Sequence, residues 1–120
     1  MATSGSSSVQ RLTKAREFDE VFKGAKYRAN CPGFLVLAIE NRQSFSRIGM
    51  VVSKRTAGNA VNRNRIRRLI RESFRLRFDM KGLDVVMVAR PPASKMENSA
   101  MLEVLSDLWV RLSKTVRVER

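Results

Sequence analysis

The sequence predicts an α+β fold in which one central sheet packs against three helices. Three segments carry apolar residues at helical spacing, and three others are short apolar runs typical of buried strands. Glycine or proline residues interrupt the chain between several of them. With 120 residues, 43% of them hydrophobic, the chain suits one core, so we expect a single domain over residues 11–120. The small polar residues before it predict a disordered lead-in over residues 1–10.

The first predicted helix covers residues 12–22. Its apolar side chains recur every three or four positions and are Leu12, Ala15, Phe18, Val21 and Phe22. Thr13 is the expected N-cap, and Gly24 lies just past the end. Because this helix is short, packing against the rest of the fold must stabilise it.

Two apolar runs follow the first helix. Residues 34–39 read Phe-Leu-Val-Leu-Ala-Ile, and residues 47–53 read Arg-Ile-Gly-Met-Val-Val-Ser. A polar stretch separates the two runs, so we expect them to pair as an antiparallel hairpin. Residues 27–30 are a further candidate strand.

The second half of the chain predicts a helix, a strand and a helix. A turn at residues 58–59 precedes a helix that begins at residue 60 or 61 and continues to about residue 78. Residues 83–89 form a buried strand, which two prolines end. The last helix lies beyond residue 94, and its apolar positions are Met101, Val104, Leu105, Leu108, Trp109 and Leu112.

Positive charge is concentrated around the second helix. The chain has 24 Lys and Arg against 11 Asp and Glu, a formal net charge of +13, and a polyanionic partner is the simplest reason to carry it. Residues 54–77 contain nine of these bases and one acid, Glu72. Eight of the nine are arginine, whose planar guanidinium makes two parallel hydrogen bonds to a phosphate. This segment is therefore predicted to bind nucleic acid.

A helical wheel divides the segment into two faces. One face carries Ile66, Leu69, Ile70, Ser73 and Phe74, and the opposite face carries Arg67, Arg68, Arg71 and Arg75. Like charges four residues apart destabilise a helix by a few tenths of a kcal/mol per pair, so an external anion is expected to compensate them. A basic helix is often only a solvated face, but such faces mix both signs of charge, which this one does not.

The residue types exclude several kinds of site. Histidine is absent, which excludes imidazole acid–base catalysis, Ser-His-Asp arrangements and the usual zinc sites. Cys31 alone can form neither an internal disulfide nor a metal site. No glycine-rich phosphate loop follows a strand. No segment approaches the roughly 20 apolar residues that span a bilayer, and no signal peptide is evident, so we expect a cytoplasmic protein without a membrane partner.

The residues of this region resemble a known family. Lys54-Arg55, Gly58-Asn59-Ala60-Val61 and the run from Arg63-Asn64-Arg65 to Arg75 are similar to the RNR signature of the bacterial ribonuclease P protein. The strands at residues 47–53 and 84–90 resemble those that flank the signature. Phe18 and Phe22 match the aromatic residues of the family's first helix. The resemblance extends over roughly residues 11–115.

The resemblance implies a fold and a function. The fold is a small α-β sandwich with a left-handed βαβ crossover, although the general rule favours right-handed crossovers. In this family the RNA subunit cleaves the substrate, and the protein binds that RNA and the 5′ leader of precursor tRNA. The chain is then part of a ribonucleoprotein endoribonuclease of tRNA processing and is not catalytic alone. The protein itself is expected to bind no cofactor, Mg²⁺ is expected at the RNA active centre, and DNA is not an expected partner.

The resemblance also assigns residues to these partners. Those expected to bind RNA are Lys54, Arg55, Arg63, Asn64, Arg65, Arg67, Arg68, Arg71 and Arg75. Phe18, Phe22, Leu37 and Ser53 are expected to line the cleft for the leader, where aromatic rings stack on bases. The family often has an aromatic residue where this chain has Leu37, so the cleft is expected to stack bases less well or to depend more on phosphate contacts.

Two other classes of basic protein fit the composition. A small ribosomal or other structural RNA-binding protein would carry similar charge without a role in cleavage. A helix-turn-helix DNA-binding domain needs a compact pair of helices, whereas strands are predicted on both sides of the arginine-rich helix. Only the signature block distinguishes the ribonuclease P reading from the ribosomal one.

Overall fold

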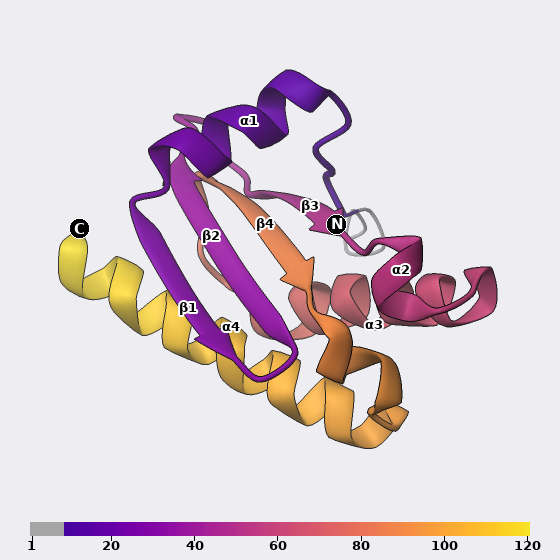
Figure 1. Ribbon diagram of the computed structural model, residues 1–120. Coiled ribbons are helices and arrows are strands. Elements are labelled where there is room, and N and C mark those ends of the chain that lie inside the picture. Colours follow the sequence, from indigo (N-terminus) through magenta and orange to yellow (C-terminus); the bar gives the residue numbers. More distant parts are fainter. Residues whose placement is uncertain (1–8) are drawn as a thin grey trace.

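The computed structural model of the protein describes residues 9–120 and contains one sheet between two helical layers (Figure 1). The elements in chain order are α1 (Ala15–Gly24), β1 (Tyr27–Cys31), β2 (Phe34–Glu40), β3 (Arg47–Val51), α2 (Lys54–Ala57), α3 (Ala60–Arg77), β4 (Leu83–Ala89), η2 (Pro91–Lys95) and α4 (Asn98–Glu119). The predicted α+β class, the three main helices and the candidate strand near residue 27 are confirmed. The short helices α2 and η2 were not predicted.

The sheet has four strands in the order β1-β2-β4-β3. β2 pairs antiparallel with both β1 and β4, and β3 pairs parallel with β4. The predicted hairpin between residues 34–39 and 47–53 is therefore wrong, because β4 lies between those two strands. The polar stretch connects β2 to β3 past β4, which lies between them. The hairpin partner of β2 is β1.

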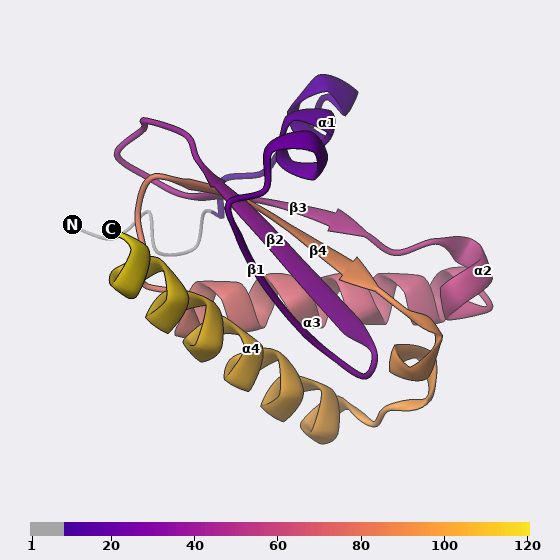
Figure 2. The ribbon, with the colours of Figure 1, turned by 60° about the vertical axis from the view of Figure 1, so that its left-hand side comes forward.

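Helices cover the two faces of the sheet unequally. α3 and α4 lie side by side on one face, and α1 lies on the other, over one end of the strands (Figures 1 and 2). The α3–α4 side holds the larger core, which includes Phe34, Ile48, Met87 and Trp109. A smaller cluster of Leu12, Val21, Leu37 and Val86 lies beneath α1. The β3–α3–β4 unit is the parallel crossover that the resemblance implies, and its left-handedness stays a prediction.

The segment before α1 pairs with the edge of the sheet. The amide of Ile48 donates to the carbonyl oxygen of Gln10, and the amide of Leu12 donates to the carbonyl oxygen of Ile48, each at 3.0 Å. Val9 packs against the larger core. Val9 and Gln10, assigned to the lead-in by the sequence, thus contact the fold, whereas residues 1–8 of that predicted lead-in lie outside the described residues.

The start of α1 is set by a carboxylate rather than by the predicted N-cap. Glu17 accepts hydrogen bonds from the amides of Thr13 and Lys14, at 2.8 and 3.0 Å, and Lys14 occupies the N-cap position. Thr13 as N-cap is therefore wrong. Leu12, whose amide is committed to β3, stands outside the helix, so the first turn begins at Ala15.

Candidate nucleic-acid interface

α3 is attached to the fold by the apolar stripe that the helical wheel predicts. The buried residues of this helix are Ile66, Leu69, Ile70, Ser73 and Phe74. The polar member of the stripe has a partner: the indole nitrogen of Trp109 donates to the Ser73 hydroxyl at 2.8 Å, and that hydroxyl donates to the carbonyl of Ile70. This buried bond fixes the rotation of α3 against α4, which keeps the opposite face of α3 directed outwards.

The outward face of α3 carries basic side chains with almost no acidic partners. Arg63, Asn64, Arg68 and Arg75 are exposed, and Arg67 and Arg71 are half-buried. Within residues 9–120, the one ion pair formed by a base of α3 joins Arg75 to Glu72 at 4.0 Å, between two exposed side chains. Pairs of this kind contribute little, so the positive charge of this face is left uncompensated.

Arg67 shows the electrostatic consequence most clearly. Burial, followed by the neighbouring charges of Arg63, Arg71 and Arg11, lowers the pKa of its guanidinium. Arg63 and Arg71 lie one turn of α3 away on either side, and Arg11 comes from the segment paired with β3. Arg11 and Arg67 line one pocket of about 370 Å³ together with Thr13 and Phe18. A bound phosphate would relieve this repulsion.

Arg65 has a different position from the other arginines of the signature. Its guanidinium donates to the carbonyl oxygen of Met96 at 2.9 Å and to the side-chain oxygen of Asn98 at 2.8 Å, and its Nε donates to Asn62. Asn62 in turn donates to the carbonyls of Ala57 and Ser94. The arginine therefore ties the start of α3 to the start of α4, and its donors are directed at the protein instead of at an external ligand.

The remaining basic residues of the prediction lie next to the start of α3. Lys54 and Arg55 are exposed on α2, which begins where the Ser53 hydroxyl accepts from the amide of Thr56 at 2.9 Å. Gly58, with a φ of 89°, allows the sharp turn from α2 into α3. Arg63 donates to the carbonyl of Val52 at 2.7 Å. The basic residues from α2 to Arg75 thus follow one another along a single edge and face of the fold.

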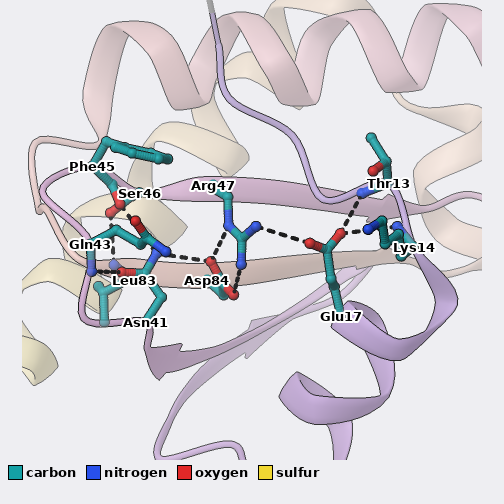
Figure 3. A network of polar contacts seen from close by, with 10 residues as sticks. All are labelled: Thr13, Lys14, Glu17, Asn41, Gln43, Phe45, Ser46, Arg47, Leu83 and Asp84. Atoms are coloured by element: carbon teal, nitrogen blue, oxygen red, sulfur yellow. Dashed lines mark hydrogen bonds and ion pairs between the residues drawn. The ribbon is translucent and has the colours of Figure 1, made fainter.

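A partly buried ion-pair network holds α1 against the sheet (Figure 3). Arg47 of β3 makes two bonds to Asp84 of β4, at 2.8 and 2.7 Å, and one to Glu17 of α1 at 2.9 Å. The amides of Lys14 and Thr13, and then Arg47, hold the pKa of Glu17 below its usual value. The hydrogen bonds to Asp84 are the main cause that raises the pKa of Arg47. One side chain thereby fixes the position of α1 over two strands.

The cleft residues expected beside α1 are only partly accessible. Phe18 is half-buried over Gly49, where an added Cβ would lie 2.6 Å from its ring. Phe22 is 46% exposed. Leu37 is only 5% exposed and lies in the cluster beneath α1, so its assignment to the open cleft is corrected. Ser53 is exposed at the end of the sheet.

The open part of this sheet face is aliphatic. Register places Leu35 of β2 opposite Val88 of β4, and Val88 opposite Val51 of β3, and all three are half-buried. This row lies one step beyond Leu37, Val86 and Gly49, the row that α1 covers. The sheet face next to α1, where the leader cleft is predicted, is thus a half-buried aliphatic surface.

Comparison with known proteins connects this geometry to a family. A family model described as Ribonuclease P matches residues 7–113 of the chain. The chain belongs to the ribonuclease P protein family. The ribonuclease P protein component of Chromohalobacter salexigens is 37% identical over 118 residues, which cover 98% of this chain and 92% of that protein. That of Legionella pneumophila is 38% identical over 104 residues, covering 87% and 90% of the two chains.

Solved structures of ribonuclease P proteins have the same fold. The Staphylococcus aureus protein, at 28% identity, matches with a TM-score of 0.75 over 92% of this chain and 97% of its own. The Thermotoga maritima protein, at 31% identity, matches with a TM-score of 0.70 over 83% and 96% of the two chains. The signature block therefore indicated the correct family, and the ribosomal and helix-turn-helix readings are not favoured.

Sequence reasoning missed several residues of this ribonuclease P protein. Arg11 was counted only in the net charge, because nothing local indicates that backbone pairing with β3 brings it to Arg67. Arg47 and Asp84 lie at the ends of their strands, and their partnership depends on the parallel register. The one feature of the sequence that pointed to this ion pair was a base at the start of one predicted strand and an acid at the start of another.

None of the helices described over residues 9–120 has the length and hydropathy to span a membrane.

Proposed function

We propose that the outward face of α3 binds the catalytic RNA of ribonuclease P. The observation that carries this proposal is a row of guanidinium groups on α3 with almost no carboxylate partners, on a fold of this family. Each guanidinium neutralises a phosphate and releases condensed counterions, so the affinity should fall steeply with salt. The proposed surface consists of residues from α3 and of two bases from α2, and Arg65 supports it from within. The residues are Arg63, Asn64, Arg67, Arg68, Arg71 and Arg75 of α3, with Lys54 and Arg55 of α2.

The 5′ leader of precursor tRNA is proposed to lie in the cleft beside α1. Phe22 offers an exposed ring, and stacking on such a ring accepts any base. Phe18 is half-buried and lines the pocket that also contains Arg11 and Arg67. The aliphatic surface of Leu35, Val51 and Val88 gives apolar contact, but it has no aromatic residue. The leader should therefore be held by α1 and by phosphate contacts from the basic edge near Lys54, with limited preference for sequence.

The proposed contribution to the reaction is electrostatic and positional. The RNA subunit would carry the chemistry with its own Mg²⁺ ions, and the protein would supply neither a nucleophile nor a general base. Its positive face would lower the repulsion where RNA subunit, leader and substrate phosphates meet. The benefit should appear in substrate affinity and in activity at low Mg²⁺.

Reconstitution tests the proposal. The chain is mixed with a ribonuclease P RNA and a precursor tRNA, and 5′ processing is followed across a Mg²⁺ series. We expect stimulation that is largest at low Mg²⁺ and that disappears when the leader is shortened to one nucleotide. Tight binding to ribosomal RNA without stimulated processing would instead support a structural RNA-binding protein.

A further inference from the structure

A second pocket lies at the far end of α3, away from the cleft beside α1. It has a volume of about 330 Å³ and is formed between the loop that joins β2 to β3 and the C-terminal end of α3. Its apolar walls include Phe45, Phe74, Phe78 and Met80. Phe74 and Phe78 stack at 5.3 Å between ring centroids, which makes the inner wall rigid.

Phe45 is an exposed aromatic side chain in a loop that hydrogen bonds hold in shape. The side-chain amide of Asn41 donates to the carbonyl of Phe45 at 3.1 Å and to Asp84 at 2.9 Å (Figure 3). The neighbouring Ser46 hydroxyl donates to the carbonyl of Met80 at 2.8 Å and accepts from the amide of Leu83. The loop is thus bound to the strands, yet the Phe45 side chain remains 40% exposed.

The rim of this pocket is positively charged. Arg75 and Lys81 line it and are exposed. The acid on the rim, Asp79, pairs with Arg117 of α4 at 3.1 Å, so it does not offset them. Arg75 is also the last of the arginines on the outward face of α3. The pocket is therefore continuous with the proposed RNA-binding surface, and its charge suits a polyanion.

We infer that this pocket takes one unstacked nucleobase of the catalytic RNA, with Phe45 as its stacking partner and Arg75 and Lys81 beside the adjoining phosphates. A rigid aromatic ring next to two cations is the combination that single-stranded nucleic acid uses on proteins. Gln10 and Ser44 also line the pocket and offer hydrogen bonds to a base edge. The inference rests on the proposed binding of that RNA by α3.

The RNA subunit, and not the leader, is the expected source of the base. Arg75 belongs to both the pocket and the face of α3, so one RNA can follow α3 and end in the pocket. The cleft beside α1 has its own aromatic residues, Phe18 and Phe22, which come from a different element. A base from the leader would have to leave that cleft to reach Phe45.

The experiment compares Phe45→Ala, Phe45→Leu and Phe45→Trp with the unaltered chain, using a ribonuclease P RNA transcript as the probe. At about 1–3 kcal/mol for one stacked base, Ala and Leu should each weaken binding by about 5- to 150-fold, whereas Trp should retain it. RNA should also quench the fluorescence of the added Trp. Val118→Ala, which trims an 83% exposed side chain on α4, is the matched control and should change nothing. Circular dichroism melting checks that each variant is folded.

The outcomes separate this inference from the proposed function. If the unaltered chain does not bind the transcript, the proposed function fails. If it binds, and folded Phe45→Ala binds both the transcript and, in the holoenzyme, precursor tRNA equally well, the base pocket is wrong while the α3 interface stands. Full binding by Phe45→Leu would also overturn the inference, because it would assign Phe45 to packing. If Phe45→Ala leaves transcript binding intact but weakens precursor tRNA binding by the holoenzyme, the base comes from the leader, and the assignment to the RNA subunit is wrong.

Discussion

Replacing Arg67, Arg68 and Arg71 by alanine should separate stability from RNA binding. None of the three forms an ion pair with a carboxylate of residues 9–120, so no buried acid is left without its partner. The change removes three repulsive pairs at i, i+4 spacing along Arg63, Arg67, Arg71 and Arg75. At about 0.2–0.5 kcal/mol per pair, removing three pairs stabilises the helix by about 0.6–1.5 kcal/mol. Lost packing of the half-buried Arg67 stem offsets part of this gain.

The same variant should lose much of the salt dependence of binding. Three phosphate contacts contribute about 2–3 to the slope of log affinity against log salt, at about 0.7–0.9 each. Between 50 and 200 mM salt, the unaltered chain should therefore lose about 20- to 40-fold more affinity than the variant. Thermal melting should show an unchanged or slightly raised Tm, by a few degrees at most.

The assay is a filter-binding or anisotropy titration of a ribonuclease P RNA at several salt concentrations. A variant with Arg28 of β1 and Arg111 and Lys114 of α4 changed to alanine carries the same loss of three charges. Its one exposed ion pair, between Arg111 and Asp107, contributes little, so it should remain folded and keep most of the slope. A folded α3 variant with the affinity and slope of the unaltered chain would remove α3 from the interface, and an equal loss in both variants would reduce the effect to net charge.

Three further predictions concern how the surface is held together. Gly49→Ala should lower the free energy of unfolding by about 1–3 kcal/mol, because the new Cβ would lie 2.6 Å from the Phe18 ring. Gly24→Ala, where the nearest neighbour of the new Cβ is 3.9 Å away, should leave that free energy unchanged or raise it. Chemical denaturation measures both. Arg65→Ala should destabilise by about 1–3 kcal/mol, because two acceptors at the start of α4 lose their donor; a loss of RNA binding at unchanged stability would contradict this assignment. Because the folded-state pKa of Glu17 is lowered, its stabilisation is complete above its unfolded-state pKa of 4.5 and is lost as pH falls through the folded value. The Tm should therefore drop more steeply below that pH in the unaltered chain than in Glu17→Gln, and identical profiles would contradict it.

The elements and the two faces of α3 follow from the sequence itself. Apolar positions such as Ile66, Ile70 and Phe74 recur with the helical period, and arginines occupy the positions between them. This information is local, so the helix, its buried stripe and its basic face could be predicted before any contact was known. The signature block supplied the family in the same way, because it is a continuous run of residues.

Three features depended on the tertiary structure: which strands pair, which side chains the helices cover, and where the arginine side chains donate their hydrogen bonds. The sequence placed β2 beside β3, but the chain inserts β4 between them, and no local pattern indicates which strand returns to which edge. The sequence assigned Leu37 to the cleft, but α1 covers it. It assigned Arg65 to the RNA-binding residues, but the side chain of Arg65 donates to Asn98 at the start of α4. Each of these outcomes depends on segments far apart in the chain. A single sequence therefore defines what each element can bury or expose, and only long-range packing decides which side chains are left for RNA.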